Sequence, residues 1–397
     1  MTTIAQLRAL IDGQVAPLAP QPVALADALG CVLAEPVMAR EDQPGFDRSA
    51  IDGYAVCADA TAGGFRLCGE ILPGAAAPPA PAKDECWRIF TGSAVPETCG
   101  LVMQEDSDVQ GERVFLRVAA SVGLVRRRGS SIRAGQKLLD AGTVLHAGEI
   151  ALLASAGIDA PPVGPRPRVV HVTTGREVVP TGGPVGAGQV RDVNGPLIAA
   201  LLQEHDARHM AQVHVDERRE ALVEAVARAG DFDVLLVSGG ASVGRHDNSR
   251  AALEALGFEV LVERVNSRPG KPLVVARRGA QWAFGLPGNP VAHYVTFQVF
   301  IARALARLAG RAGPAECTAP LAAGCTPTAD ARETFWPARF VAGPAGREVE
   351  LLRWIDSGDV GALAGVDALV RIPAGLVPQE GDRVAYVPCS RSQDHFP

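Results

Sequence analysis

RVVHV (168–172) is followed by PLIAALLQEH (196–205), AQVHV (211–215), RREALVEAVARA (218–229), DVLLVSG (233–239), AALEALG (251–257) and EVLVERV (259–265). The segments alternate between short β-branched runs and longer stretches in which apolar residues recur at helical spacing. Strands that alternate with helices are best accommodated by a parallel sheet with helices on its faces. The sequence therefore predicts a central parallel three-layer α/β/α domain, whose ligands would collect at the carboxyl ends of the strands.

The sequence on either side of this region is dominated by short strand patterns. They are GYAVCA (53–58), CWRIF (86–90), LVMQE (101–105) and RVFLRVA (113–119) before it, and TFWPARFVA (334–342), REVELLRW (347–354), ALVRIPA (368–374) and RVAYVP (383–388) after it. Two helical patterns, TIAQLRALIDG (3–13) and ALADALG (24–30), predict short N-terminal helices. We expect a helical linker domain (1–37 and 140–163), a mostly β domain (38–139), the α/β domain (164–309) and a C-terminal small β-barrel (315–397).

Composition excludes several classes of protein. Hydrophobic residues make up 47% of the 397 residues and charged ones 21%, which is globular, and the net charge of −6 gives no reason to expect nucleic acid. No apolar stretch reaches the roughly 18 residues that cross a bilayer, and the first residues lack the pattern of a signal peptide. The eight cysteines show no C-x-x-C pair, so reduced thiols outside any site are expected. We expect a cytoplasmic protein.

The strongest chemical signal is VLLVSGGASVGRHD (234–247), in which a buried strand runs into glycines. Gly239 and Gly240 have no side chains, so their backbone amides can approach a ligand closely. Ser238 and Ser242 add hydroxyl donors, and Asp247 supplies a hard oxygen ligand that could position Mg²⁺ against a phosphate. A Gly-rich turn between a strand and a helix, without any ligand, is the plainer alternative.

The same stretch contains GASVG (240–244), which matches the G-x-S-x-G nucleophile elbow, with His293 downstream as a conceivable base. An elbow requires a helix that starts at the serine. Residues 245–248, RHDN, instead resemble a further loop with a helix cap. We therefore do not interpret Ser242 as a nucleophile.

Two further segments predict an anion site. RPGKP (268–272) places Arg268 and Lys271 around a turn at Gly270, and phosphate or another oxyanion is the natural partner of such a pair. GLPGNP (285–290) leads from a strand into a long helix, whose first amides can bind an anion. The structural alternative is that Asn289 only caps a helix begun by Pro290, and both functions can coexist.

The N-terminal half contributes weaker signals. PGFDRSAIDGYAV (44–56) places Asp47 and Asp52 on either side of a tight turn, and RIFTGSAVP (88–96) contains Thr91. RRRGSSIRAGQK (126–137) concentrates basic residues around a Gly-Ser loop. This loop is either an anion-attracting patch or a solvated basic face.

Together these segments resemble the MoeA family of molybdopterin molybdenumtransferases and the E domain of gephyrin. The resemblance rests on PGFDRSAIDGYAV, RIFTGSAVP with VMQE (102–105), RRRG, TTGREV (173–178), SGGASVGRHD, RPGKP and GLPGNP, all in the family's order along nearly the whole chain. It implies a molybdopterin-binding α/β domain and a cytoplasmic homodimer. It also implies transfer of molybdate into the dithiolene of adenylylated molybdopterin with release of AMP, helped by Mg²⁺. A molybdopterin adenylyltransferase and molybdoenzyme-maturation proteins are the implied partners.

The resemblance also implies residue roles. Asp247 and Glu177 would organise the metal or molybdate, and Lys271 would neutralise phosphate. Asp52 and Thr91 would face them from the partner subunit. The implied cofactor-binding residues are Ser238, Gly239, Gly240, Ser242, Arg268, Gly270, Pro287, Gly288, Asn289 and Pro290.

The chain departs from the family pattern at several positions. Arg176 stands where the family usually has Asp, Ser130 and Ser131 stand where Glu-Asp often follows RRRG, and Arg268 replaces a Lys. If Arg176 pointed into the site it would repel Mg²⁺ and attract an oxyanion; if it pointed to solvent it would do neither. A transferase is therefore the main hypothesis. The alternatives are a non-catalytic molybdopterin carrier and a scaffold.

Overall fold

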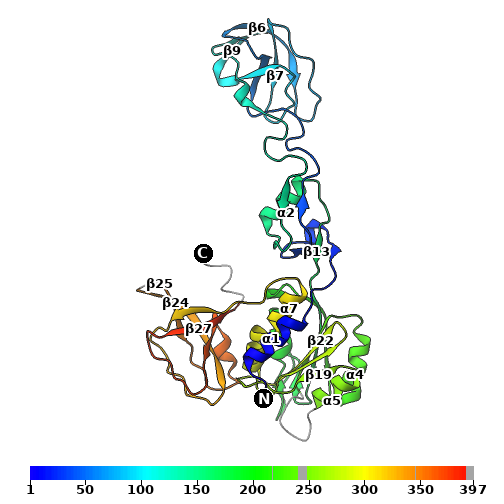
Figure 1. Cartoon of the computed structure of the whole chain (residues 1–397), viewed down its shortest axis with the longest axis vertical. Coiled ribbons are helices and arrows are strands. Elements are labelled where there is room, and N and C mark those ends of the chain that lie inside the picture. Colours follow the sequence, from blue (N-terminus) through cyan, green and yellow to red (C-terminus); the bar gives the residue numbers. More distant parts are fainter. Residues whose placement is uncertain (217, 240–247, 345, 390–397) are drawn as a thin grey trace. The chain divides into compact units, whose positions relative to one another are not determined.

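The computed structural model describes residues 1–216, 218–239, 248–344 and 346–389, drawn in colour in Figure 1. They fall into two compact units. The first unit contains residues 1–23, 30–34 and 162–397, and the second contains residues 24–29 and 35–161. The α/β region and the C-terminal strands both belong to the first unit.

The central sheet of the first unit has six strands in the order β17-β14-β18-β22-β21-β19. They are β14 (Arg168–Thr174), β17 (Arg208–Val215), β18 (Val234–Ser238), β19 (Glu259–Val262), β21 (Val274–Arg278) and β22 (Gln281–Leu286). The first four in this order run parallel, but β21 is antiparallel to β22 and to β19. The prediction of a wholly parallel sheet is therefore wrong at β21. Only Gly279 and Ala280 connect β21 to β22, and so short a connection joins antiparallel strands only.

The two faces of this sheet pack against different helices. Val169, Leu236 and Phe284 share a core with α1 (Ile4–Gln14), α3 (Asn194–Glu204), α6 (Pro290–Thr296), the π-helical turn η4 (Phe297–Ile301) and α7 (Ala302–Leu308). The alternate residues, such as Val170 and Leu235, share a core with α4 (Arg219–Arg228) and α5 (Asn248–Ala255). Figure 1 shows α1 and α7 on one side of β22, and α4 and α5 on the other.

Local sequence explains where the two long helical elements begin. The Thr3 hydroxyl oxygen accepts a hydrogen bond from the Gln6 amide, and the Gln6 side-chain oxygen accepts one from the Thr3 amide, which caps α1. Pro290 occupies the first turn of α6, where its missing N–H is no loss. From Pro290 the helix continues through η4 to Leu308.

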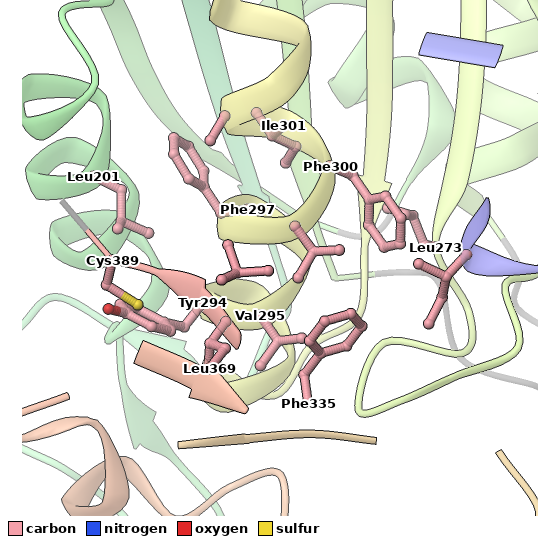
Figure 2. Packing of buried hydrophobic residues seen from close by; sticks show 14 of the residues in the cluster. Leu201, Leu273, Tyr294, Val295, Phe297, Phe300, Ile301, Phe335, Leu369 and Cys389 are labelled. Atoms are coloured by element: carbon pink, nitrogen blue, oxygen red, sulfur yellow. The ribbon is translucent and has the colours of Figure 1, made fainter. Parts of the chain in front are cut away.

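The C-terminal strands form a second sheet in the first unit, in the order β20-β24-β26-β27-β23, with β25 added to β24. Their bounds are β20 (Ser267–Arg268), β23 (Cys317–Pro320), β24 (Glu333–Gly343), β25 (Gly346–Leu351), β26 (Ala368–Ile372) and β27 (Arg383–Pro388), with a 3-10 turn η5 (Val360–Leu363). Phe335 of β24 and Leu369 of β26 lie near Val295 of α6, in the same hydrophobic cluster as Phe300 of η4 (Figure 2). The two sheets therefore share one hydrophobic core.

Short strand pairs complete the first unit. β1 (Gln21–Pro22), β13 (Pro162–Gly164) and β2 (Val32–Leu33) form one small sheet, and β15 (Val178–Val179) pairs with β16 (Val190–Arg191). The prediction of a second short helix near the N-terminus, at residues 24–30, is wrong. Residues Leu25–Asp27 form a single 3-10 turn, because the prolines before them and Gly30, at φ +77°, leave too little room for an α-helix.

The second unit is built around a six-stranded sheet in the order β8-β5-β7-β6-β10-β9. The strands are β5 (Gly53–Cys57), β6 (Gly63–Ile71), β7 (Glu85–Ile89), β8 (Cys99–Met103), β9 (Ser107–Gln110) and β10 (Arg113–Leu116). The remaining elements are β3 (Val37–Met38), β4 (Arg48–Ser49), η2 (Gln104–Asp106), η3 (Val122–Leu124), β11 (Val125–Arg126), β12 (Lys137–Leu139) and α2 (Ala147–Ser155).

Two expectations from composition can be compared with the fold. None of the eight cysteines, all of them in the described part of the chain, forms a disulfide, and Cys317 is exposed. Among the helices of the described residues, none is long and apolar enough to span a membrane.

Candidate functional site

One edge of the central sheet brings several of the predicted segments together. In the register of the parallel strands Thr173 lies beside Ser238, and Ser238 lies beside Leu286, so β14, β18 and β22 end at the same edge. Because β21 runs the other way, it begins there, with Val274 beside Gly285. The antiparallel strand thus places the RPGKP turn, which precedes Val274, at the carboxyl edge of the parallel strands.

Ser238 lies at this edge but faces inward. Its side chain is 2% exposed, and its hydroxyl lies 2.6 Å from His171 Nε2 and 2.7 Å from His293 Nε2. Both histidines are fully buried. The prediction that the Ser238 hydroxyl donates to a ligand is therefore wrong. Ser238 shares a strand face with Leu236 and Val234, and that face is covered by α6.

The two imidazoles are held in their neutral forms. Burial lowers the pKa of His293 to about 4, against a smaller opposing effect of the Asn289 carbonyl. Burial also lowers the pKa of His171 well below its ordinary value, with the neighbouring imidazoles of His293 and His209 contributing. His293, considered above as a base for Ser242, is instead committed to Ser238.

Gly239 has no room for a side chain. Its φ is +92°, and a Cβ there would lie 2.7 Å from both the carbonyl oxygen and Oγ1 of Thr174. Its amide donates to the carbonyl of Leu286 at 3.4 Å, and its carbonyl accepts from the Ser249 hydroxyl at 2.8 Å. Glycine is therefore needed here for close packing of β18 on β14. Gly240, Ser242 and Asp247 lie outside the described residues.

The two cations of the RPGKP turn, Arg268 and Lys271, lie in different surroundings. Gly270 has φ +102°, and a Cβ on it would lie 2.6 Å from Thr296 Cγ2, so only glycine fits. The carbonyl of the half-buried Lys271 accepts from the Val265 amide at 3.0 Å. Within the described part of the chain, the Lys271 ammonium forms no salt bridge.

Arg268 points into the C-terminal part of the unit. Its guanidinium lies 3.5 Å from the Asp330 carboxylate, donates to the Thr328 hydroxyl at 3.3 Å, and stacks 5.3 Å from the centre of the Trp354 ring. These contacts indicate a structural role for Arg268, and its predicted binding of the pterin substrate stays a prediction. The planar guanidinium can stack and hydrogen-bond at once, which a lysine could not.

The GLPGNP segment is also held by the C-terminal part. The Asn289 amide side chain donates to the Ser357 hydroxyl at 2.5 Å, and the Val291 N–H donates to the Ser357 carbonyl at 3.1 Å. Asn289 therefore occupies the cap position without capping through its side chain. We expected the first amides of this helix to be able to bind an anion. The Val291 amide is not free to do so, because it donates to the Ser357 carbonyl. Pro287 is buried and Gly288 is exposed, with Pro290 between these extremes.

Glu177 and Arg176 follow the end of β14, and both are exposed. The Glu177 carbonyl accepts from the Val190 amide at 2.9 Å, which leaves its carboxylate at the surface of the turn. Arg176 acts on Asp216: a hydrogen bond from Arg218 is the main cause that lowers the pKa of Asp216, and the charge of Arg176 adds to it. This arrangement supports the solvent-facing alternative for Arg176.

The described residues do not by themselves make a site for Mg²⁺. They contain no group of three or more His, Cys, Asp or Glu side chains that could hold a metal ion. Of the two predicted metal ligands, Glu177 is described and Asp247 is not. Mg²⁺ takes six oxygen ligands, and sites built on one or two carboxylates complete them with waters and substrate phosphate.

In the second unit, Asp52 and Thr91 are directly bonded to each other. The Thr91 amide and hydroxyl donate to Asp52 Oδ1 at 2.7 Å and 2.8 Å. Both bonds lower the pKa of Asp52, and the bond from the Thr91 amide has the larger effect. The Asp52 carboxylate is therefore charged at neutral pH. Thr91 therefore orients Asp52, and both side chains are exposed.

The basic loop of the second unit is largely neutralised. Arg127 pairs with Asp47, and Arg128 donates to Asp42 at 2.9 Å and, through its amide, to Asp47 at 2.8 Å. Partial burial opposes the bonds that lower the pKa of Asp47, while the Ala134 amide is the main cause that lowers the pKa of Asp42. The anion-attracting patch we considered is therefore mostly an ion-paired loop.

Sequence reasoning missed two polar residues near the sheet edge, Asp192 and Asn194. Asp192 accepts from the Gly195 amide at 2.8 Å, and Asn194 donates to the Gly288 carbonyl at 2.8 Å. A Cβ on Gly195 would lie 1.8 Å from Gln212 Nε2, so a side chain at this helix start would have to displace that of Gln212. The Asp-x-Asn-Gly sequence before an apolar run was the available signal.

Two protein families and several known proteins are similar to this chain. Residues 2–157 match the family described as the MoeA N-terminal region (domain I and II), and residues 171–307 match the family described as a probable molybdopterin binding domain. A molybdopterin molybdenumtransferase from Nostoc sp. is 36% identical over 309 residues, which are 72% of this chain and 68% of that relative. The chain belongs to the molybdopterin molybdenumtransferase family.

Other members of the family match over more of their length. A molybdopterin molybdenumtransferase from Staphylococcus epidermidis is 28% identical over 366 residues, covering 88% of this chain and 86% of the relative. The crystal structure of a molybdopterin biosynthesis MoeA protein from Pyrococcus horikoshii has a TM-score of 0.77 at 25% identity, and the match covers 98% of this chain and 99% of that one. The resemblance found in the sequence motifs is thus confirmed along nearly the whole chain.

Proposed function

We propose that the protein inserts molybdate into the dithiolene of adenylylated molybdopterin and releases AMP. The family match supports the reaction class, a transferase of molybdenum cofactor biosynthesis. The observation that carries the proposal is the convergence of the motif segments at one edge of the central sheet, where the half-buried cation Lys271 precedes β21 and the exposed carboxylate Glu177 follows β14. An edge of this kind is where open α/β sheets bind their ligands.

In this proposal Lys271 neutralises the phosphate of the substrate. Its ammonium forms no salt bridge within the described residues, and the Gly270 turn fixes the backbone that carries it. Gly288 is exposed and has no side chain to block a ligand, with Pro287 and Pro290 on either side as the wall. The Ser238 hydroxyl and the Arg268 guanidinium are engaged within the fold, and neither group is a ligand in this scheme.

The metal and dimer parts of the proposal rest on the family resemblance. Mg²⁺ is the expected helper ion, with Asp247 and Glu177 as its carboxylates. In a homodimer, Asp52 and Thr91 of the partner subunit would face them, and the bond between these two residues supports a paired role. An adenylyltransferase upstream and molybdoenzyme-maturation proteins downstream are the proposed partners. The proposal includes a cytoplasmic location, the three-layer arrangement and the C-terminal barrel.

Substitution of Lys271 tests the site. Lys271→Ala should lower kcat/KM for molybdate-dependent AMP release by about tenfold or more, the loss expected for one desolvated charge-assisted contact. Arg228→Ala is the matched control, because it also removes one positive charge and the Arg228 side chain is 78% exposed at the end of α4, which precedes β18. A folded Lys271→Ala protein as active as Arg228→Ala would remove Lys271 from the site.

The observation that favours the carrier alternative is Arg176, which stands where the family usually has an Asp carboxylate. A carrier would bind molybdopterin-AMP tightly and release no AMP when molybdate is added. Binding without release, in a protein supplied with Mg²⁺, would favour that alternative over the transferase.

A further inference from the structure

A buried polar network crosses the core just beneath the proposed site. It consists of His171 on β14, Ser238 at the end of β18 and His293 on α6, and we call it the buried histidine network. The Ser238 hydroxyl lies 2.6 Å from His171 Nε2 and 2.7 Å from His293 Nε2. Apolar residues of the same core, such as Leu236, occupy the rest of this sheet face. The core therefore changes from apolar to polar as it approaches the carboxyl edge.

The hydrogen bonds of this network can run in one direction only. His293 Nδ1 lies 3.2 Å from the Asn289 carbonyl, which can only accept, so Nδ1 carries the proton and Nε2 is an acceptor. The Ser238 hydroxyl then donates to His293, and His171 Nε2–H donates to Ser238. This assignment leaves both imidazoles neutral, as full burial requires.

The direction of the bonds ties three segments of the sheet edge together. His171 anchors β14, three residues before Thr174, against which Gly239 is packed. Ser238 directly precedes Gly239. His293 holds the carbonyl of Asn289, the residue next to the exposed Gly288. Ser238 thus joins the ends of β14 and β18 to the first turn of α6.

Stability alone does not require this network. Replacing hydrogen-bonded buried groups by apolar groups of similar shape is often neutral or stabilising, whereas a satisfied polar network fixes one arrangement. The network also leaves His171 Nδ1 buried and, among the described atoms, without a hydrogen-bond partner, which is a cost to the fold. The polar arrangement is therefore better explained by what it positions than by what it stabilises.

We propose that His171 and His293, acting through Ser238, are positioning residues of the molybdenumtransferase site, and that they hold Gly239 and Gly288–Asn289 at the spacing the phosphate of adenylylated molybdopterin requires. This inference rests on the proposed function, which places the substrate at this edge. Neither histidine touches the substrate, because both are fully buried.

The test compares apolar and polar replacements of His293. Gln can place an amide oxygen near the position of Nε2 and accept from Ser238, whereas Leu cannot. His293→Leu should raise the Kd for molybdopterin-AMP by about tenfold or more, the loss that follows when one buried polar group is left unpaired. His293→Gln should remain within about threefold of the wild type. His205→Leu is the control, because His205 is a mostly buried histidine of the same unit that bonds to Gln298 instead.

A second variant guards against loss of folding. In His171→Leu/Ser238→Ala/His293→Leu the whole network is apolar, so the variant should fold with a melting temperature near that of the wild type and still bind molybdopterin-AMP about tenfold more weakly. Wild-type affinity in this folded variant overturns the proposal, and so does equal impairment of His293→Gln and His293→Leu.

The binding measurement separates this proposal from the proposed function. If the wild type binds molybdopterin-AMP but releases no AMP, the transferase reaction fails while the positioning role is still decided by the Kd values. A spectroscopic signature supports the same decision: ¹⁵N NMR of labelled histidine should show His293 as the Nδ1–H tautomer and His171 as the Nε2–H tautomer. Any other tautomer pair contradicts the direction of the network.

Discussion

Acidification should loosen the central sheet through His293. The pKa of this imidazole is lowered by burial from its ordinary 6.5 to about 4 in the folded protein. Between these two values the unfolded state binds more protons than the folded state. The contribution of His293 to the free energy of unfolding is therefore fully present above pH 6.5 and is lost as the pH falls toward 4. One pKa unit corresponds to about 1.4 kcal/mol. The contribution of His293 should therefore fall by about 2 kcal/mol between pH 7.5 and pH 5.

Amide hydrogen exchange of the β18 peptide, corrected for the intrinsic exchange rate at each pH, measures the free energy of opening this sheet. The wild type should lose at least about 2 kcal/mol from pH 7.5 to pH 5, because the lowered pKa of His171 acts in the same direction. In His293→Gln, the loss should be smaller by about 2 kcal/mol. Among the described residues, the groups that act on the two imidazoles are His209, the Asn289 carbonyl and Ser238, and none of these three is a carboxylate. Identical pH dependence in the wild type and in His293→Gln would refute this reasoning.

Three further outcomes follow from individual contacts. Gly270→Ala should destabilise the first unit by about 2–5 kcal/mol, because its backbone is left-handed and Thr296 blocks a Cβ; thermal unfolding should show a smaller loss for Gly279→Ala, where the space is open. Thr91→Val should raise the pKa of Asp52 by removing a donor to its carboxylate, measured by ¹³C NMR titration, and an unchanged pKa would contradict the bond. Arg268→Lys should lower the melting temperature through loss of stacking on Trp354, with an unchanged Kd for molybdopterin-AMP. A weakened Kd at a normal melting temperature would instead restore Arg268 as a ligand.

The sequence allowed prediction of the main strands and helices of the α/β region, because long periodic segments carry strong signals. β18 reads VLLVS and is buried throughout, and α3, α4 and α5 form where helical spacing was found. The reversed direction of β21 was missed, although Gly279 between two apolar runs was a turn signal. β6 was missed because GGFRLCGEI is rich in glycine and polar residues.

The site was harder to predict because chemistry depends on which way a side chain points. The alternation of β18 already places Ser238 on the face of Leu236, so its burial could have been predicted. Its two histidine partners could not have been predicted, because His171 and His293 are 122 residues apart in the sequence. They come together only when α6 packs on the sheet. Arg268 likewise contacts Trp354 and Asp330, which lie far from it in the sequence. No local sequence pattern indicates these contacts.

The most direct test of the proposed reaction is AMP release from molybdopterin-AMP by the purified protein, with and without molybdate and Mg²⁺, while molybdenum cofactor formation is followed. Release that requires molybdate, with one cofactor formed for each AMP, is the result that the transferase proposal predicts. Tight binding of molybdopterin-AMP without molybdate-dependent release would contradict it.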